Sequence, residues 1–327
     1  RLDGASFETA DDEVLNNWHE RLNVLWRNIA APNVALWMHV IRRRERVLSG
    51  NTDDARAEDF AERLSARYQA RLSTETLMVN ELYLSVAYRP IVGAAPNLLA
   101  RLISAKAGEN RLAEHADALD ACDKLAQTVG SSLARYDPER LGVYESSGRL
   151  YSRVLEFFGQ LVNADLSPVP LPTAPIDEVL ATTRIIFGSE TIEYRLPTQT
   201  RFGAILGIKE YASPTTVGMY NVLLSAPFEF VLTQSFAFLT KAAGQGLLQR
   251  QYNQMANAGD FAVSQAEQLK DALDDLTSND FVMGDHHFTL QILTPLVDRQ
   301  GGNSSEQRLK SLNDDVALAR AILADTG

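Results

Sequence analysis

Two kinds of hydrophobic periodicity alternate along this chain of 327 residues, and the alternation constrains the fold more than any single segment does. Val34–Arg44 and Leu77–Tyr88 are rich in aliphatic and aromatic residues, which is typical of strands. Between them, the apolar residues of Asp54–Leu72 recur at every fourth position, which predicts an amphipathic helix. The alternation predicts an α+β fold with mixed or largely antiparallel sheets covered by helices.

A proline-rich segment divides the chain into two parts. Ser167–Pro172 contains three prolines in six residues, and the segment continues to Pro175. Proline fixes φ and has no N–H to donate, so such a segment is typical of a linker. We therefore predict an N-terminal α+β subdomain (residues 1–166), a linker (167–175) and a second α+β subdomain (176–327).

The second part contains a helical pattern that starts near Ser235 and extends to Leu276, which predicts one long helix. Within its second half, small and apolar residues follow a coiled-coil-type spacing: Met255, Ala262, Ala266, Leu269, Leu273 and Leu276. A helix of this length seldom buries its whole length within one domain. Leu269 and Leu273 are therefore predicted interface residues, facing another domain of the protein or another subunit.

The start of this helical pattern contains two further features. Gly244 and Gly246 indicate a local distortion or a close helix contact. The apolar window Phe228–Leu248 is interrupted by polar and charged residues, so it falls short of the ~20 apolar residues that a membrane span requires. Its phenylalanines predict core packing, although such a stripe is also compatible with docking of a partner, and any membrane association is expected to be peripheral.

The formal net charge of −11 disfavours nonspecific nucleic-acid binding, which depends on Lys and Arg. The densest basic cluster consists of Arg42, Arg43, Arg44 and Arg46. One interpretation is contact with an anion, either a lipid headgroup or a nucleic acid. The favoured interpretation is a solvated strand end beside an acidic helix that contains Asp53, Asp54, Glu58 and Asp59. Arg42, Arg43 and Arg44 remain candidate interface residues.

The triplet Asp285-His286-His287 is the strongest catalytic pattern in the chain. Aspartate and histidine ligate divalent metals, and an Asp-His-His triplet occurs in a phosphoesterase family, so a metal-dependent phosphoesterase is the alternative function. The other histidines are not at metal-ligand spacings, and the single cysteine, Cys122, excludes CxxC motifs. No catalytic residue, cofactor-binding residue or metal ligand is therefore predicted.

Longer segments give a more specific signal than these short patterns. Between Arg201 and His287 they are FGAILGIKEY, YASPTTVGMYNVLL, LSAPFEFVLTQSF and SNDFVMGDHHF. DGASFET, NELYLSVAYRP and ENRLAEHADAL extend the set over nearly the whole chain. Together these segments resemble the N-terminal domain of the type IV secretion system ATPases, the VirB/TrbE/CagE family of bacterial conjugation and secretion motors.

The resemblance implies a docking and assembly role within an ATPase that energises pilus biogenesis and conjugative export of DNA or protein. Members of that family hydrolyse ATP with a P-loop, G-x-x-x-x-G-K-[ST], and this chain contains no such motif. It is expected to be catalytically silent alone, with ATP and Mg²⁺ bound by a C-terminal motor domain.

The resemblance also implies partners and a location. The expected partners are other inner-membrane components of the secretion system, the chain's own motor domain and, in the full-length protein, further copies of itself. No direct nucleic-acid contact is expected for this part. The expected location is the cytoplasmic face of the bacterial inner membrane.

Overall fold

The computed structural model describes residues 1–7, 9–46, 60–74, 76–89, 107–211, 215–258, 263–298 and 304–325. Its helices are α1 (Asp12–Ile29), α2 (Phe60–Thr74), α4 (Ala107–Ser132), α5 (Arg153–Asn163), α6 (Ile176–Val179), α7 (Lys241–Ala258), α8 (Val263–Ser278) and α9 (Ser305–Ala324). Short 3₁₀ helices are η1 (Ala134–Tyr136) and η2 (Asn221–Ser225). Its strands are β1 (Val34–Arg46), β2 (Thr76–Tyr88), β3 (Val143–Ser146), β4 (Arg149–Ser152), β5 (Arg184–Phe187), β6 (Ile192–Arg195), β7 (Gln199–Gly207), β8 (Glu229–Phe238), β9 (Gly284–Leu293) and β10 (Val297–Asp298).

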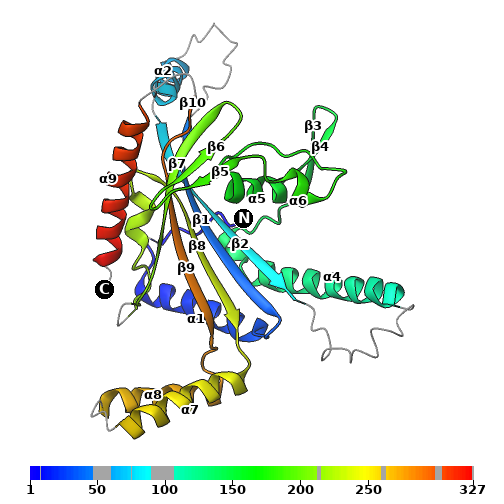
Figure 1. Ribbon diagram of the computed structural model, residues 1–327, viewed down its shortest axis with the longest axis vertical. Helices are drawn as coiled ribbons and strands as arrows, with labels where there is room; N and C mark the ends of the chain where they lie inside the picture. The colour runs from blue at the N-terminus through cyan, green and yellow to red at the C-terminus, as the bar shows by residue number, and fades with distance from the viewer. Residues whose placement is uncertain are drawn as a thin grey trace. The chain divides into compact units, whose positions relative to one another are not determined.

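The main sheet has the strand order β2-β1-β8-β9-β7-β6-β5, with β10 paired to β7 (Figure 1). The pairs with a described register are antiparallel; they are β5–β6, β6–β7, β7–β9, β7–β10 and, in a separate hairpin, β3–β4. The predicted α+β class with antiparallel pairing is confirmed.

The described chain divides into two compact units, each assembled from three segments. Unit 1 comprises Arg1–Met38, Tyr83–Arg140 and Gln234–His287. Unit 2 comprises His39–Leu82, Leu141–Thr233 and Phe288–Gly327. The predicted division at residues 167–175 concerns a segment inside unit 2, and it stays a prediction.

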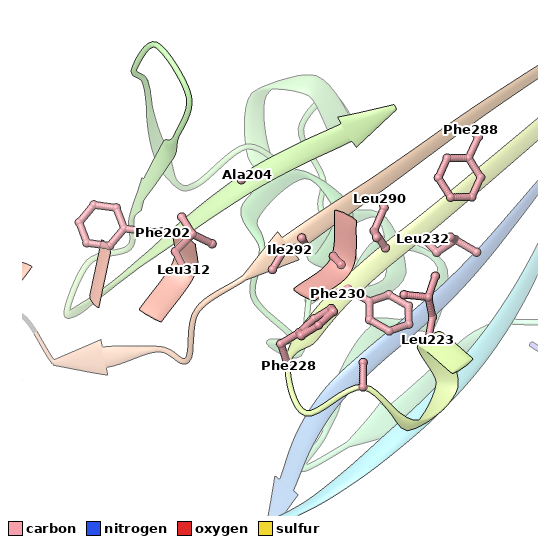
Figure 2. Close-up of a cluster of buried hydrophobic side chains, with 12 residues drawn as sticks. Phe202, Ala204, Leu223, Phe228, Phe230, Leu232, Phe288, Leu290, Ile292 and Leu312 are labelled. Carbon is pink, nitrogen blue, oxygen red and sulfur yellow. The ribbon is translucent and has the colours of Figure 1, made fainter. Parts of the chain in front are cut away.

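The core of unit 2 is formed by alternate residues of neighbouring strands (Figure 2). Phe230 and Leu232 share one face of β8, and Leu290 and Ile292 share one face of β9, because successive side chains of a strand alternate between faces. Leu312 of α9 completes this core at 0% exposure. The helix begins with a capping box in which Ser304 and Gln307 each accept a hydrogen bond from the other's backbone N–H. These contacts bury α9 against the sheet of unit 2.

Unit 1 has a separate core. Helix α1 contributes Leu25 and Ile29, and α4 contributes Val129. Val34 and Leu36 of β1 and Phe238 of β8 lie in the same cluster. Because the buried residues of α1 are four positions apart, they occupy one helix face.

The predicted single helix from Ser235 to Leu276 is wrong. Residues up to Phe238 continue β8, because Phe238 is buried at 4% exposure in the core of unit 1. The backbone N–H of Leu239 then donates to the carbonyl of Met283 at 2.9 Å. Beyond this point the helical residues form α7 and α8, which pack side by side (Figure 1). Two shorter helices bury their apolar residues against each other, which one long helix cannot do.

The contact between α7 and α8 explains one of the two glycines. A Cβ at Gly244 would lie 3.1 Å from a Leu276 methyl carbon and 3.1 Å from the Met283 sulfur, whereas a Cβ at Gly246 would meet no atom within 4 Å. The predicted close helix contact is therefore confirmed at Gly244. Leu269 and Leu273 are half-buried on α8, and their interface role stays a prediction.

Candidate functional site

A polar cavity of about 440 Å³ lies in unit 2 beside the arginines of β1. Its walls come from β1, the C-terminal end of α5, β7, β8 and the residues that follow β9. The polar residues that line it are Arg42, Arg43, Arg44, Gln160, Asp165, Arg201 and Glu229. The structure therefore brings the predicted basic cluster together with residues that lie more than a hundred positions away in the sequence.

Arg201 of β7 joins three walls of this cavity. It is 5% exposed, and its Nε donates to the carbonyl of Thr294 at 2.8 Å. Its two terminal nitrogens donate to the carbonyl of Ala164 at 2.9 Å and to the carboxylate of Glu229. Burial lowers the pKa of Arg201, and the Glu229 carboxylate opposes that shift. A buried charge requires such pairing, so this ion pair fixes α5, β8 and the end of β9 around the cavity.

Arg42 is held in place by neutral acceptors. It is 7% exposed, and its Nε donates to the carbonyl of Ala226 at 2.6 Å. Its Nη1 donates to Oδ1 of Asn80 at 2.9 Å, and Asn80 donates in turn to the carbonyl of Leu224. Burial lowers the pKa of Arg42. These contacts connect β1, β2 and η2 within unit 2.

Arg43 and Arg44 are paired with carboxylates of β1, β2 and β8. Arg43 donates to both oxygens of Glu81, at 3.1 and 3.2 Å, and lies 3.2 Å from Glu45. Arg44 is 43% exposed, and its Nε lies 3.7 Å from Oε1 of Glu229. The predicted acidic helix around Asp53 and Glu58 and the side chain of Arg46 lie outside the described residues. The interface role of Arg42, Arg43 and Arg44 stays a prediction.

Gln160 of α5 is a further polar residue of this cavity. It is 7% exposed, and its Oε1 has no hydrogen-bond partner among the described residues. Helix α5 is anchored at both ends, because Ser152 accepts from the N–H of Leu155 and Asn163 accepts from the N–H groups of residues 182 and 183. The anchoring holds this buried, unpaired acceptor at the cavity wall.

This arrangement suits binding more than catalysis. Gln160 has an unpaired acceptor and Arg44 has a positive charge, but no nucleophile with an adjacent base is among the residues that line the cavity. Gln160, Arg201 and Glu229 were not predicted as site residues from the sequence. A charged residue at the start of an apolar strand, as in RFGAIL, is the signal that indicates a buried ion pair.

The Asp285-His286-His287 triplet lies in β9, and all three residues are exposed. Among the described residues, no group of three or more His, Cys, Asp or Glu is arranged to hold a metal ion. His286 borders an apolar cavity of unit 1 of about 380 Å³, lined by Trp26, Phe236 and Phe281. Burial lowers the pKa of His286, and the charge of His287 lowers it further. The phosphoesterase alternative has no support.

No helix of the described residues combines the length and the apolar composition needed to cross a bilayer.

Two family models match the chain. Residues 139–299 match the CagE, TrbE, VirB family, a component of the type IV transporter system. Residues 1–95 match the N-terminal domain of the type IV secretion system ATPase VirB4/TrbE. These matches place the chain in the class of type IV secretion components.

Curated relatives agree with the family models. The chain is 38% identical over 325 residues to the type IV secretion system protein virB4 of Bartonella henselae, covering 98% of the chain and 41% of the relative. It is 38% identical over 298 residues to PtlC of Bordetella pertussis, covering 90% of the chain and 35% of the relative. It is 35% identical over 336 residues to virB4 of Brucella suis, covering 100% of the chain and 40% of the relative.

The chain belongs to the CagE/TrbE/VirB family and corresponds to the N-terminal domain of its VirB4-type members. It spans between 35% and 41% of the length of these curated relatives.

Proposed function

We propose that this chain is the docking and assembly domain of a VirB4-type ATPase. In this proposal the whole protein energises pilus biogenesis and the export of DNA or protein at the cytoplasmic face of the bacterial inner membrane. The observation that carries the proposal is that type IV secretion proteins align with nearly the whole chain, although its sequence contains no P-loop. ATP and Mg²⁺ belong, in this proposal, to the motor part of the protein.

The proposed assembly surface is the α7–α8 pair of unit 1. Its outer residues include Leu247 at 42% exposure and Tyr252 at 38% exposure. Leu269 and Leu273 are half-buried on α8, which leaves part of each side chain accessible to a partner. The proposed partners are further copies of the protein and inner-membrane components of the same secretion system, with peripheral association at the membrane.

Competition in living cells tests the docking role. The chain is overproduced in a bacterium that carries an active conjugation system of the same family, and the frequency of plasmid transfer is measured. A docking domain without a motor occupies the sites of the intact ATPase, so the transfer frequency is expected to fall at least tenfold. An unchanged frequency at high intracellular levels of folded chain argues against docking.

The assembly surface is tested by light scattering coupled to size exclusion. We expect a concentration-dependent oligomer that is lost in the double variant Leu247→Asp/Tyr252→Asp, because charges on the outer face oppose burial against a second copy. Circular dichroism checks that the variant retains its helices. Leu269→Asp/Leu273→Asp tests the predicted interface residues in the same way. A wild-type chain that is monomeric at every concentration removes self-association of this domain from the proposal.

The proposal excludes direct nucleic-acid binding through the arginine cluster. Arg42 and Arg43 are held by acceptors of the same unit, and the chain is acidic overall. Binding to DNA with a steep salt dependence, abolished by Arg44→Glu, would show that this exclusion is wrong.

A further inference from the structure

The cavity of unit 2 contains a buried acceptor without a donor. Gln160 is 7% exposed, and its Oε1 has no hydrogen-bond partner among the described residues. Burying an unpaired carbonyl oxygen costs free energy, so folded proteins usually pair such atoms with protein, water or ligand. Gln160 lines the cavity, so a change in its side-chain rotamer would bring this buried oxygen to a hydrogen-bond donor there.

The same cavity contains an arginine that makes no hydrogen bond to the described residues. Nε of Arg44 lies 3.7 Å from Oε1 of Glu229, which is too far for a hydrogen bond. The other lining arginines are engaged, Arg201 by three acceptors and Arg43 by two carboxylates. The 43% exposure of the Arg44 side chain lets its terminal nitrogens reach an incoming anion.

The charge and polarity of the lining restrict the class of ligand. Four arginines line the cavity, whereas its carboxylates are Asp165 and Glu229. An occupant with an acidic group is therefore favoured over a basic one. Leu166, Leu293, Pro295 and Leu296 add apolar wall, and the volume of about 440 Å³ is within the range of small-ligand sites. The ligand needs an acidic group, an N–H donor and aliphatic surface together.

We propose that this cavity binds a short acidic peptide segment. A side-chain carboxylate of the peptide accepts hydrogen bonds from the Nη atoms of Arg44, and a backbone N–H donates to Oε1 of Gln160. Flanking aliphatic side chains pack on Leu293 and Leu296. The proposal deepens the docking function and rests on it only for the source of the peptide, a partner protein of the secretion system.

The probe is the capped peptide acetyl-Leu-Glu-Leu-amide, compared with acetyl-Leu-Gln-Leu-amide. Binding is followed by backbone amide shifts in NMR spectra of the whole chain. The acidic peptide is expected to shift the amide signals of Gln160, Leu293, Thr294 and Leu296 and to bind at least tenfold more tightly than the neutral peptide. Equal affinities, or an absence of shifts at the cavity, would overturn the proposal.

Two variants test the assigned atoms. Arg44→Gln is expected to lower the affinity for the acidic peptide at least tenfold, whereas the control Arg195→Gln is expected to leave this affinity unchanged. Arg195 is matched in exposure, at 42%, is paired with Glu193 and does not line the cavity. Loss of binding in both variants indicates a nonspecific charge effect and would overturn the proposal.

Gln160→Leu distinguishes a ligand contact from a structural role. Because the Gln160 oxygen has no partner among the described residues, its removal is expected to leave the melting temperature unchanged or higher while peptide affinity falls. Retained affinity in a folded variant would contradict the assignment. Should this variant fail to fold, Gln160→Glu replaces it, and repulsion of the acidic peptide is expected.

A last binding experiment distinguishes a peptide site from a site that binds any small anion. Sodium acetate supplies the carboxylate without the N–H and is expected to cause no comparable shifts at the concentration where the peptide saturates the cavity. Equal shifts with acetate would overturn the peptide assignment. The competition and light-scattering experiments can fail while the peptide still binds, so the site and the docking function are tested separately.

Discussion

The core of unit 2 and the α7–α8 pair of unit 1 are stabilised in different ways. In unit 2, Phe230, Leu290 and Leu312 are 0–1% exposed, although they come from elements far apart in the sequence. In the described residues of α7 and α8, the buried positions are Gly244 and Leu276. The core of unit 2 therefore depends on long-range burial, and the helix pair depends on a few close contacts.

This difference predicts how each region responds to mutation and to local unfolding. Truncation of a core side chain in unit 2 leaves a cavity that the strands cannot close. The helix pair has few fully buried side chains, so its local opening is expected to cost less free energy than global unfolding. It also depends on capping, since Nζ of Lys241 donates to the carbonyl of Thr277 at 2.6 Å and to Asn279 at 2.9 Å.

The largest effect is expected in the core of unit 2. Phe230→Ala should reduce the free energy of unfolding by about 3–5 kcal/mol, because the residue is 1% exposed and its ring fills the core. Urea titration followed by circular dichroism measures the loss. The control Val217→Ala, at 85% exposure, should change stability by no more than about 0.5 kcal/mol. Similar losses in the two variants would contradict the assigned core.

The buried ion pair beside the cavity should give the next largest effect. Arg201→Met leaves the carboxylate of Glu229, whose side chain is 12% exposed, with the distant Nε of Arg44 as its one cationic partner among the described residues. The expected loss of stability is about 3 kcal/mol. The double variant Arg201→Met/Glu229→Leu should recover part of this loss, and a double-mutant cycle measures the coupling. A double variant as unstable as the sum of the single variants would show that the pair is uncoupled.

The two glycines of α7 allow a closely packed position, Gly244, to be compared with an open one, Gly246, in the same helix. Gly246→Ala should stabilise the helix by up to about 1 kcal/mol, because alanine has the higher helix propensity and the added Cβ meets no atom. Gly244→Ala should stabilise it less or destabilise it, because the added Cβ lies 3.1 Å from Leu276 and Met283. Hydrogen exchange of the α7 and α8 amides measures both changes. Equal effects at the two positions would show that the side chains of Leu276 and Met283 can move away from an added Cβ at Gly244 without a cost in free energy.

The smallest expected effect is a pH dependence of the free energy of unfolding that arises from His39 in unit 2. Burial lowers the pKa of His39 below its ordinary value of 6.5, so the unfolded chain takes up this proton first as the pH falls. The contribution of neutral His39 to the free energy of unfolding is therefore fully present above pH 6.5. It is lost as the pH falls toward the pKa of His39 in the folded state. Unfolding at about pH 7.5 and about pH 5.5 measures this loss, which His39→Gln should reduce. An unchanged pH dependence in the variant would exclude His39 as its source.

Part of the fold was predictable because its signals are local. The strand-type pattern of Leu77–Tyr88 corresponds to β2, and the helix class of the C-terminal segment follows from its own periodicity and capping residues. The hairpin of β3 and β4 also has a local signal. Its turn residues, Ser147 and Gly148, have φ values of 51° and 73°, and a Ser-Gly pair indicates such a turn.

The candidate site was only partly predictable. The arginines of β1 were visible as a cluster, but their acceptors come from β2, β8 and η2, which no local pattern joins to them. Gln160 has no distinguishing neighbours in the sequence, and its importance comes from burial without a partner. The end of β8 was missed for a related reason, since helical and strand periodicity are ambiguous over short apolar runs.

The sequence by itself determined the α+β class and the membership of the type IV secretion family, because both depend on patterns spread over the whole chain. The tertiary structure decided that β8 extends to Phe238, that two helices replace one, and that Arg201 and Glu229 form the wall of a polar cavity. The physical reason is that burial and charge pairing are long-range, so the environment of a residue depends on segments that the fold brings to it.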